Sequence, residues 1–505
     1  MGPTTHIHWR PVLLVWLMLL VLGFGIMVAI APQTRIYEDI ICRRYYADGP
    51  EQSITLGIAF LPDDGPRHQG PDEKACKDPV IQDALNQLFG WQTFFDGIPG
   101  LLLAMYYGSL ADSWGRRPIL VLSLVGQLLG ALWILFICWI EADVKLTWLS
   151  SIFSCIGGGN TVFTAAAMMI IADATPDASR TRVFFYASTC LIVGEMLGPP
   201  VGAALMAHDP WIPNILGFLC MGIATIFAFL MPETLGKASG SDTEGNPATW
   251  DNEQATSNGL PLKAAVQHAL TTLRFIFQDR NLALLVAAYF TVDFARETLG
   301  LLVRYVSARF SIPLAQASYL LSFRASGQLL ATALLLPLFD ALLAKRFKSS
   351  PQRKDLFMAR ISIVFVTLGF ATLIIAPGMA VIYAGIALYT CGTGFQASTK
   401  ALLGSMVDRT LLGTVFTTLS LMDTVGALFA GPIDALLMKH SLRMEGIWQS
   451  LPFMFAFLCC ALATVSLGYV KLRRGDVSLE DAGDEERRVF LAGQESERED
   501  DRVVG

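Results

Sequence analysis

The chain has 505 residues, of which 53% are hydrophobic and 16% are charged, and its mean hydropathy is +0.50. This composition excludes a soluble multidomain protein, and the number of apolar segments excludes a single membrane anchor. The net charge of −6 says little about partners, because the charged residues lie mainly in loops and tails, and the sequence shows no basic face for a nucleic acid. We therefore expect an all-α polytopic membrane protein.

Apolar segments of about 20 residues, long enough to cross a hydrocarbon core of about 30 Å, recur along the chain. They lie near 11–31, 88–111, 118–140, 147–171, 182–206, 212–231, 281–303, 315–338, 357–377, 379–402, 411–437 and 449–470. Basic residues gather in the short loops on one side of these segments, so the positive-inside rule places both termini in the cytoplasm. The pattern predicts twelve transmembrane helices.

The polar stretches between these segments divide the chain. We expect a cytoplasmic N-terminus (1–10), a first six-helix half (11–231) with a long outer loop (32–87), a cytoplasmic linker (232–280), a second half (281–470) and a disordered acidic tail (471–505). Cys42 and Cys76 lie in the outer loop, where both a disulfide and two free thiols are compatible with the sequence.

An internal repeat relates the two parts of the chain. Residues 193–206 align without gaps on residues 425–438, and the glycine-containing stretch 155–173 is similar to 391–408. The fourth and fifth spans therefore recur as the tenth and eleventh. This predicts two pseudo-symmetric six-helix halves with a substrate path between them.

Residues 108–118, Gly-Ser-Leu-Ala-Asp-Ser-Trp-Gly-Arg-Arg-Pro, form a polar turn between the second and third spans. Gly108 permits a close approach of two backbones, Asp112 can pair with Arg116, and Gly115 permits a tight turn. The turn resembles motif A of the major facilitator superfamily, and the resemblance implies a conformational gate. The candidate gate residues are Gly108, Asp112, Gly115, Arg116, Arg117, Asp173, Arg182 and Asp408.

Charged residues inside spans cost about 2.5 to 3.5 kcal/mol each, so each one is a functional candidate. For proton coupling the candidates are Asp96, Glu195, Asp293, Glu297 and Asp423. For substrate binding they are Arg296, Arg304, Arg324, Tyr289 and Trp91. The seventh span carries several of these charges on one helical face, and we expect Arg324 of the eighth span to be their partner. A permanent salt-bridge cluster that holds two helices together is the alternative.

A second motif lies in the fifth span. Gly194, Gly198, Pro199, Pro200 and Gly202 resemble motif C of the drug:proton antiporters in the same superfamily, although Ala203 stands where that pattern has another glycine. Small residues at this spacing permit close contact between helices. An ordinary packing face is therefore the alternative to an antiporter signature.

Within the superfamily, the chain most resembles fungal drug:proton antiporters and secondary-metabolite efflux carriers, and more loosely the proton-coupled folate transporter group. The first resemblance implies a secondary active transporter that works by alternating access and exports a drug-like or secondary-metabolite compound in exchange for protons. The second implies a symporter that imports an organic anion or nutrient with protons. A non-transporting membrane sensor is an alternative of another class.

The sequence shows no set of side chains for covalent catalysis or metal binding, so we expect neither an enzyme nor a cofactor. The expected partners are a small-molecule substrate, protons and membrane lipids, with no nucleic acid, and the expected state is a monomer. The plasma membrane is the predicted location, and the vacuolar membrane is the alternative.

Overall fold

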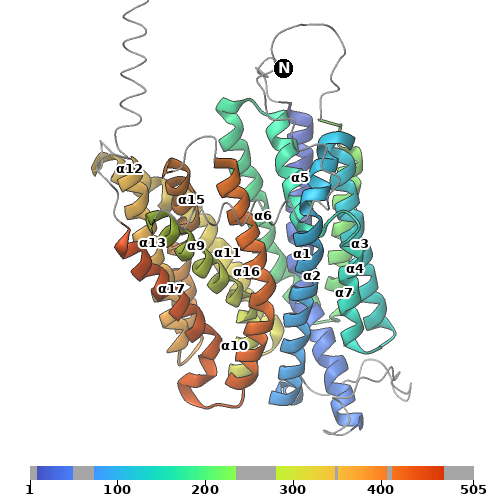
Figure 1. Ribbon diagram of the computed structural model, residues 1–505. Helices are drawn as coiled ribbons and strands as arrows, with labels where there is room; N and C mark the ends of the chain where they lie inside the picture. The colour runs from blue at the N-terminus through green and yellow to red at the C-terminus, as the bar shows by residue number, and fades with distance from the viewer. Residues whose placement is uncertain (1–7, 49–72, 235–279, 347–350, 407–411, 471–505) are drawn as a thin grey trace, which may run out of the picture.

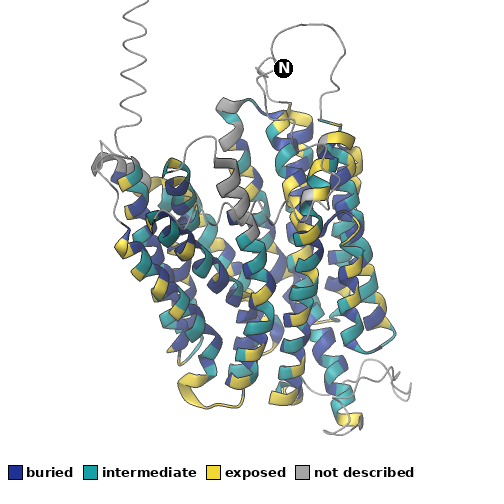
Figure 2. Cartoon of the chain, viewed as in Figure 1, coloured by how far each residue is buried: buried dark blue, intermediate teal, exposed yellow. Residues whose placement is uncertain are grey.

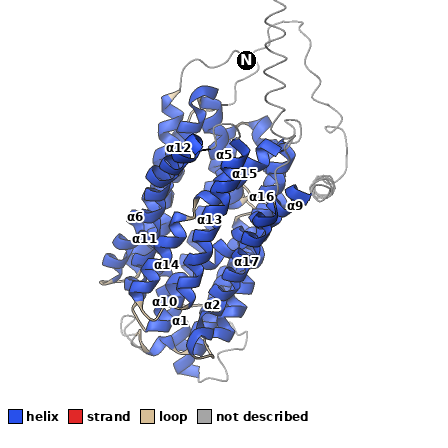
Figure 3. Ribbon diagram, turned by 90° about the vertical axis from the view of Figure 1, so that its left-hand side faces the viewer, coloured by secondary structure: helices blue, strands red, loops and turns tan. Residues whose placement is uncertain are grey.

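A computed structural model describes residues 8–48, 73–234, 280–346, 351–406 and 412–470. Within these ranges the chain is helical without any strand, which confirms the all-α prediction, and most helices run roughly parallel (Figures 1 and 3). The first half contains α1 (Trp9–Asp48), α2 (Pro79–Trp114), α3 (Arg116–Trp139), α4 (Ser150–Phe153), α5 (Gly159–Ala174), α6 (Asp177–Met206) and α7 (Trp211–Leu230). The second half contains α9 (Arg280–Glu297), α10 (Leu302–Phe310), α11 (Leu314–Leu330), α12 (Leu336–Arg346), α13 (Pro351–Ile374), α14 (Met379–Cys391), α15 (Gly394–Met406), α16 (Leu412–Ser441) and α17 (Leu451–Tyr469).

The predicted spans coincide with helical segments, some of which are interrupted. Seven helices of the described residues are long and apolar enough to cross a membrane. The fourth predicted span breaks between α4 and α5 at Gly157 and Gly158, which have φ angles of +88° and +75°. The tenth breaks between α14 and α15 at Gly392. These breaks fall at the glycines of the predicted repeat, and the count of twelve spans stays a prediction.

The expected outer loop, residues 32–87, is much shorter in the structure. α1 continues past Pro32 to its end at residue 48, and α2 begins at residue 79. The added turns of α1 bury Ile36, Tyr37 and Ile40 against α2. Because these apolar residues share one helical face, continuing the helix removes them from water. The loop prediction is therefore wrong at both ends.

The two ends of the bundle differ in chemistry. One carries the turn at Gly115 with Arg116 and Arg117, and we call it the arginine end; the start of α1 lies at this end (Figure 1). At the opposite end a disulfide joins Cys42 to Cys76, whose Cα atoms are 5.5 Å apart. We call this the disulfide end. Of the two states that the sequence left open for these cysteines, the structure has the disulfide.

Each half has its own hydrophobic core. One cluster of buried residues joins α1, α3, α5, α6 and α7, and another joins α9, α10, α11, α13, α14 and α17. Exposed positions are distributed along the outer faces of the helices (Figure 2). Four of the bulkiest fully buried side chains, those of Tyr289, Phe370, Phe395 and Phe453, belong to the second half. The second core is therefore filled with aromatic rings to a greater extent than the first.

Candidate functional site

The turn at the arginine end is held by a carboxylate that follows α7. Gly115 has a φ of +113°, a conformation that other residues rarely adopt, and this confirms the predicted tight turn. The carboxylate of Glu233 accepts hydrogen bonds from the backbone N–H groups of Arg116 at 2.9 Å and Arg117 at 3.2 Å. A negative charge thus lies at the N-terminus of α3, where the helix dipole favours it. Glu233 was not among the predicted site residues.

The two arginine side chains of this turn contact neighbouring helices. Arg116 Nε lies 3.4 Å from a carboxylate oxygen of Asp173 on α5. Arg117 donates a hydrogen bond of 2.6 Å to the backbone carbonyl of Phe229 on α7. Both contacts stay within the first half. In this structure the turn therefore ties three helices of one half together.

Other candidate gate residues behave differently from expectation. A Cβ added at Gly108 would meet no atom of another described segment within 4 Å, and the predicted close approach of a second backbone there stays a prediction. Arg182 is exposed on α6. Asp408 and the side chain of Asp112 lie outside the described residues. The predicted pairing of Asp112 with Arg116 therefore stays a prediction.

Contacts between the halves gather toward the disulfide end. A Cβ added at Gly90 of α2 would lie 2.7 Å from the carbonyl oxygen of Gly431 on α16. Closer to the disulfide end, Lys439 Nζ lies 3.4 Å from a carboxylate oxygen of Asp83. The Glu73 carboxylate accepts a 2.8 Å hydrogen bond from the first backbone N–H of α11. Helices of opposite halves are thus in close contact on this side of the bundle.

An ion pair joins the halves farther from the disulfide end. Arg324 of α11 lies 3.1 Å from Glu195 of α6, and their side chains are 22% and 28% exposed. We expected Arg324 to pair with the charged face of the seventh span, and this expectation is wrong. Because α11 packs against α6, Arg324 reaches Glu195 instead. A predicted proton-coupling residue and a predicted substrate-binding residue are therefore direct partners.

The acids of α9 are paired within the second half. Asp293 is 2% exposed, lies 2.9 Å from Arg296, and accepts a 2.8 Å hydrogen bond from Gln396 of α15. Glu297 lies 3.4 Å from the same Arg296 guanidinium. Gln396 was missed in the sequence because nothing in its neighbourhood indicates that it faces Asp293. The resulting cluster resembles the permanent salt-bridge alternative.

The predicted charged face of the seventh span is divided by a 3₁₀ turn over Thr298–Leu301. Beyond it, the Arg304 guanidinium lies 4.3 Å from the centre of the Phe89 ring in the first half. Asp434 of α16, which is 3% exposed, accepts a 3.1 Å hydrogen bond from the Thr298 hydroxyl. Arg304 and Asp434 both line a cavity of about 100 Å³ between the halves. The sequence signal for Asp434 was its place in the repeat, opposite a glycine.

Asp423 of α16 is held by an aromatic residue of α9. Its carboxylate accepts a 3.0 Å hydrogen bond from the hydroxyl of Tyr289. The Lys400 ammonium lies 5.4 Å from the centre of the Tyr289 ring, a cation–π contact. Tyr289 is fully buried, so its ring faces protein rather than open space. The predicted substrate contact therefore positions a predicted proton-coupling acid.

The first half places Asp96 of α2 beside polar groups of two helices. Its carboxylate accepts hydrogen bonds from the Ser151 hydroxyl at 2.5 Å and the Gln92 amide at 2.9 Å. Trp91, the other candidate of this helix, is exposed, and its ring stacks on Phe95 with the centroids 6.0 Å apart. The two candidates therefore differ in kind: Asp96 belongs to a hydrogen-bonded group and Trp91 to an aromatic one.

The glycines of the motif C-like segment face α1. A Cβ added at Gly194, Gly198 or Gly202 would lie 2.6, 2.7 or 2.5 Å from an atom of α1. Pro199 and Pro200 lie inside α6. These glycines therefore form a close packing face between α6 and α1. An ordinary packing face was one of the two interpretations of this motif, and an antiporter signature was the other.

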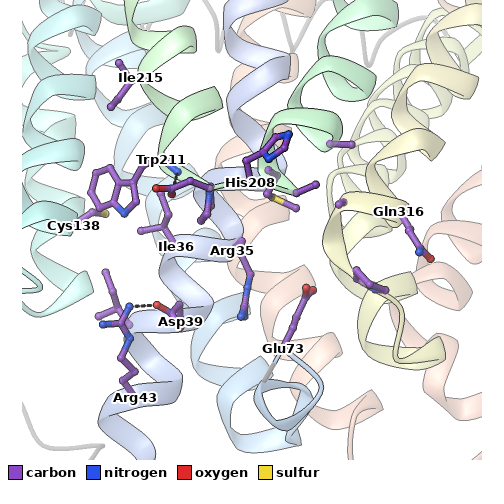
Figure 4. A pocket seen from close by; sticks show the side chains of 18 of the residues that line it. Arg35, Ile36, Asp39, Arg43, Glu73, Cys138, His208, Trp211, Ile215 and Gln316 are labelled. Atoms are coloured by element: carbon purple, nitrogen blue, oxygen red, sulfur yellow. Dashed lines mark hydrogen bonds and ion pairs between the residues drawn. The ribbon is translucent and has the colours of Figure 1, made fainter. Parts of the chain in front are cut away.

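A cavity of about 970 Å³ opens at the disulfide end among α1, α6, α7 and α11. Figure 4 shows Arg43 joined to Asp39 on one wall, with Arg35, Glu73 and Gln316 around the same space. Arg35 is itself paired with another acid of α1. Because helices of both halves line this cavity, it lies along the predicted path between them.

The charged groups of the candidate site form ion pairs and hydrogen bonds rather than a metal-binding cluster. The described ranges contain no group of three or more His, Cys, Asp or Glu side chains that could hold a metal ion. The acids that stand out are instead paired with arginines or hydrogen-bonded to hydroxyl and amide groups.

Comparison with known proteins gives consistent matches over most of the chain. The family profile of the Major Facilitator Superfamily matches residues 78–395. The chain is 35% identical over 484 residues to the MFS efflux pump atnC of Emericella nidulans, which covers 93% of this chain and 90% of that one. It is 22% identical over 430 residues to the proton-coupled folate transporter of Bos taurus, and this match covers 84% of this chain and 88% of that one. The solved D-xylose-proton symporter has a TM-score of 0.59 at 13% identity, covering 92% of this chain and 98% of that chain.

These matches confirm both resemblances drawn from the sequence, the nearer one to a fungal efflux pump and the looser one to the folate transporter group. The solved structure shows the fold alone. Members of this family are transporters and not enzymes, and the apolar helices make the chain a multi-pass membrane protein. The chain belongs to the major facilitator superfamily.

Proposed function

We propose that this transporter exports a small organic molecule of the secondary-metabolite type in exchange for protons, by alternating access of a path between its halves. The efflux pump at 35% identity supports export. The two-half architecture and the cavity shared by both halves support a path between them. We place the protein in the plasma membrane, with the vacuolar membrane as the second candidate.

The proposal of proton coupling rests on the ion pair between Glu195 of the first half and Arg324 of the second, whose charged atoms are 3.1 Å apart. Arginine stays protonated in proteins, so Glu195 is the member of the pair that can change its charge. A proton on Glu195 removes the attraction between the halves at this point and leaves Arg324 without its counter-charge. Exchange follows if proton and substrate favour opposite conformations of the two halves.

Proton-coupled import of an organic anion is the second candidate, and the folate transporter relative favours it. It requires arginines that are available to the anion. In the structure Arg296 and Arg324 are each paired with a carboxylate, and Arg304 lies over the Phe89 ring. At Arg296 and Arg324 an anion would have to displace carboxylate partners, and these two sites therefore support export better.

Flux into and out of proteoliposomes, with pH gradients of either sign, tests the direction. The two probes are tetraphenylphosphonium, a lipophilic cation, and folate, an organic dianion. We expect the cation to move against an inward proton gradient and folate to move no faster than in protein-free liposomes. Folate uptake together with protons would overturn export and establish the import candidate.

Glu195→Gln tests the coupling residue. We expect gradient-driven flux to fall by about tenfold or more while substrate counterflow persists, because the amide holds a single charge state. The matched control is Asp143→Asn, which removes an acid that accepts a hydrogen bond from the backbone N–H of Lys145 inside the first half, away from the candidate site. It should retain coupling. A Glu195→Gln protein that still responds fully to the pH gradient would remove Glu195 from the mechanism.

A further inference from the structure

A second cavity, of about 430 Å³, lies inside the first half rather than between the halves. It is partly open and is lined by α1, α3, α4, the start of α5 and α7, with Asp96 contributed by α2. Every described residue that lines it falls between positions 25 and 221, so the described part of the second half contributes no lining residue. We call it the first-half cavity. Its volume is within the range of pockets that hold small molecules, about 300 to 1,000 Å³.

Small residues form part of the walls of this cavity. Gly25 of α1 and Gly217 of α7 are in such close contact that a Cβ added at Gly217 would lie 2.6 Å from the Gly25 carbonyl oxygen. Gly130 and Ala131 occupy the facing part of α3. In the second half, by contrast, bulky aromatic rings are fully buried in the core.

One wall carries a buried amide with an unsatisfied hydrogen bond. Asn214 of α7 lines the cavity and is 6% exposed, and its Nδ2 has no hydrogen-bond partner in the part of the chain that the structure describes. An unpaired buried donor costs about 1 to 3 kcal/mol. Rotation of the amide exchanges its oxygen and nitrogen, so Asn214 can present either an acceptor or a donor to a guest.

Asp96 supplies charge to the same cavity. Among the described residues that line the space, it is the only charged one. Its carboxylate is oriented by Ser151 and Gln92, and the residue is nevertheless exposed, so it faces open space. A carboxylate without a cationic neighbour on the lining favours a cationic or hydrogen-bond-donating guest over an anion.

We propose that the first-half cavity binds a small amphipathic amine. Its ammonium group contacts Asp96, its apolar body lies against Ile26, Ile134 and Phe218, and an acceptor atom takes the hydrogen bond that Asn214 offers. This site is separate from the path between the halves, and the inference does not depend on the direction of transport. Gly97, the neighbour of Asp96, packs against Leu428 of α16, so the guest lies close to the interface between the halves.

The test uses the full chain in detergent and monodansylcadaverine as the probe, since this molecule joins a naphthalene ring, a sulfonyl acceptor and a primary amine. Titration is followed by the blue shift of dansyl emission. We expect saturable binding, and binding at least about tenfold weaker for the N-acetylated probe, which lacks the charge. Asp96→Asn should abolish this difference. Absence of saturable binding, or equal binding of both probes, would overturn the proposal.

A matched pair of variants locates the probe. Ala131→Phe fills the cavity and should reduce affinity by about tenfold or more, whereas Leu132→Phe places the same ring at a neighbouring outward-facing position and should not. Asn214→Leu should also weaken binding, while it should keep or raise the melting temperature because it removes an unpaired donor. If Ala131→Phe does not fold, Asn214→Leu tests whether the probe binds in the first-half cavity.

Glu195→Gln separates this site from the path between the halves. Probe binding should be unchanged in that variant, whatever its effect on flux. Loss of probe binding in Glu195→Gln, or full binding in both Ala131→Phe and Asn214→Leu, would place the probe between the halves and overturn the proposal.

Discussion

The two copies of the repeated helix, α6 and α16, make different kinds of interface. α6 uses Gly194, Gly198 and Gly202 to pack against α1 of its own half. α16 uses Gly431 to pack against Gly90 of α2 in the other half. The glycines of the same sequence segment therefore line an interface inside one half in the first copy and an interface between the halves in the second, although α6 also contacts α11 of the other half through Glu195 and Arg324.

The aligned positions show how this difference arises. Ala430 and Asp434 stand where the first copy has Gly198 and Gly202. A side chain at Gly202 would meet the Val28 carbonyl oxygen at 2.5 Å, whereas Asp434 has room beside the 3₁₀ turn and accepts a hydrogen bond from Thr298. Where the first copy has a glycine in close contact with α1, the second copy therefore has a buried acid.

The largest expected effect is on the interface within the first half. Gly202→Ala should destabilise the protein by about 1 to 3 kcal/mol, because the added methyl group cannot fit against the α1 backbone. Gly222→Ala on α7, where an added Cβ has no atom within 4 Å, is the matched control and should be neutral or slightly stabilising. Thermal unfolding in detergent measures both. Equal melting temperatures for the two variants would show that the interface between α1 and α6 accommodates the added methyl group, which would contradict the prediction.

The interface between the halves should respond in another way. Gly431→Ala should leave the melting temperature nearly unchanged and shift the conformational equilibrium about tenfold, because only the conformation with Gly90 in contact is penalised. A short bis-methanethiosulfonate cross-linker, which reacts with a cysteine thiol at each end and releases methanesulfinate, joins cysteines placed at Asp83 and Lys439 and so reports the conformation in which these positions are paired. We expect less cross-linking in Gly431→Ala. Unchanged cross-linking with a lowered melting temperature would make this interface as permanent as that of α6.

The smallest effect should come from two acids that cap helices at the disulfide end. Glu73 accepts a hydrogen bond from the first N–H of α11 in the other half, whereas Asp78 caps α2 in its own half. Each charge contributes about 0.3 to 1 kcal/mol. Glu73→Gln should therefore lower the cross-linking of the Asp83 and Lys439 positions, and Asp78→Asn should lower only the melting temperature. Reduced cross-linking in Asp78→Asn, with unchanged cross-linking in Glu73→Gln, would contradict the distinction between contacts inside the first half and contacts between the halves.

Most of the fold could be predicted because a membrane leaves the backbone few options besides the helix. The predicted spans coincide with helical segments on this ground, and the turn at Gly115 follows from local backbone geometry. The exception was residues 32–48, where a polar composition concealed an apolar face that packs on α2. Composition averages over all faces of a helix, so it does not reveal a single buried one.

The sequence by itself determined the helices, the glycine stripe of α6 and the tight turn, because each depends on residues that are near one another in the chain. Only the tertiary structure decided which charges meet. Glu195 and Arg324 are 129 residues apart, and Glu233 and Arg116 are 117 apart. Their pairing depends on which helices lie side by side, and hydropathy, which is similar from span to span, carries no information about that choice.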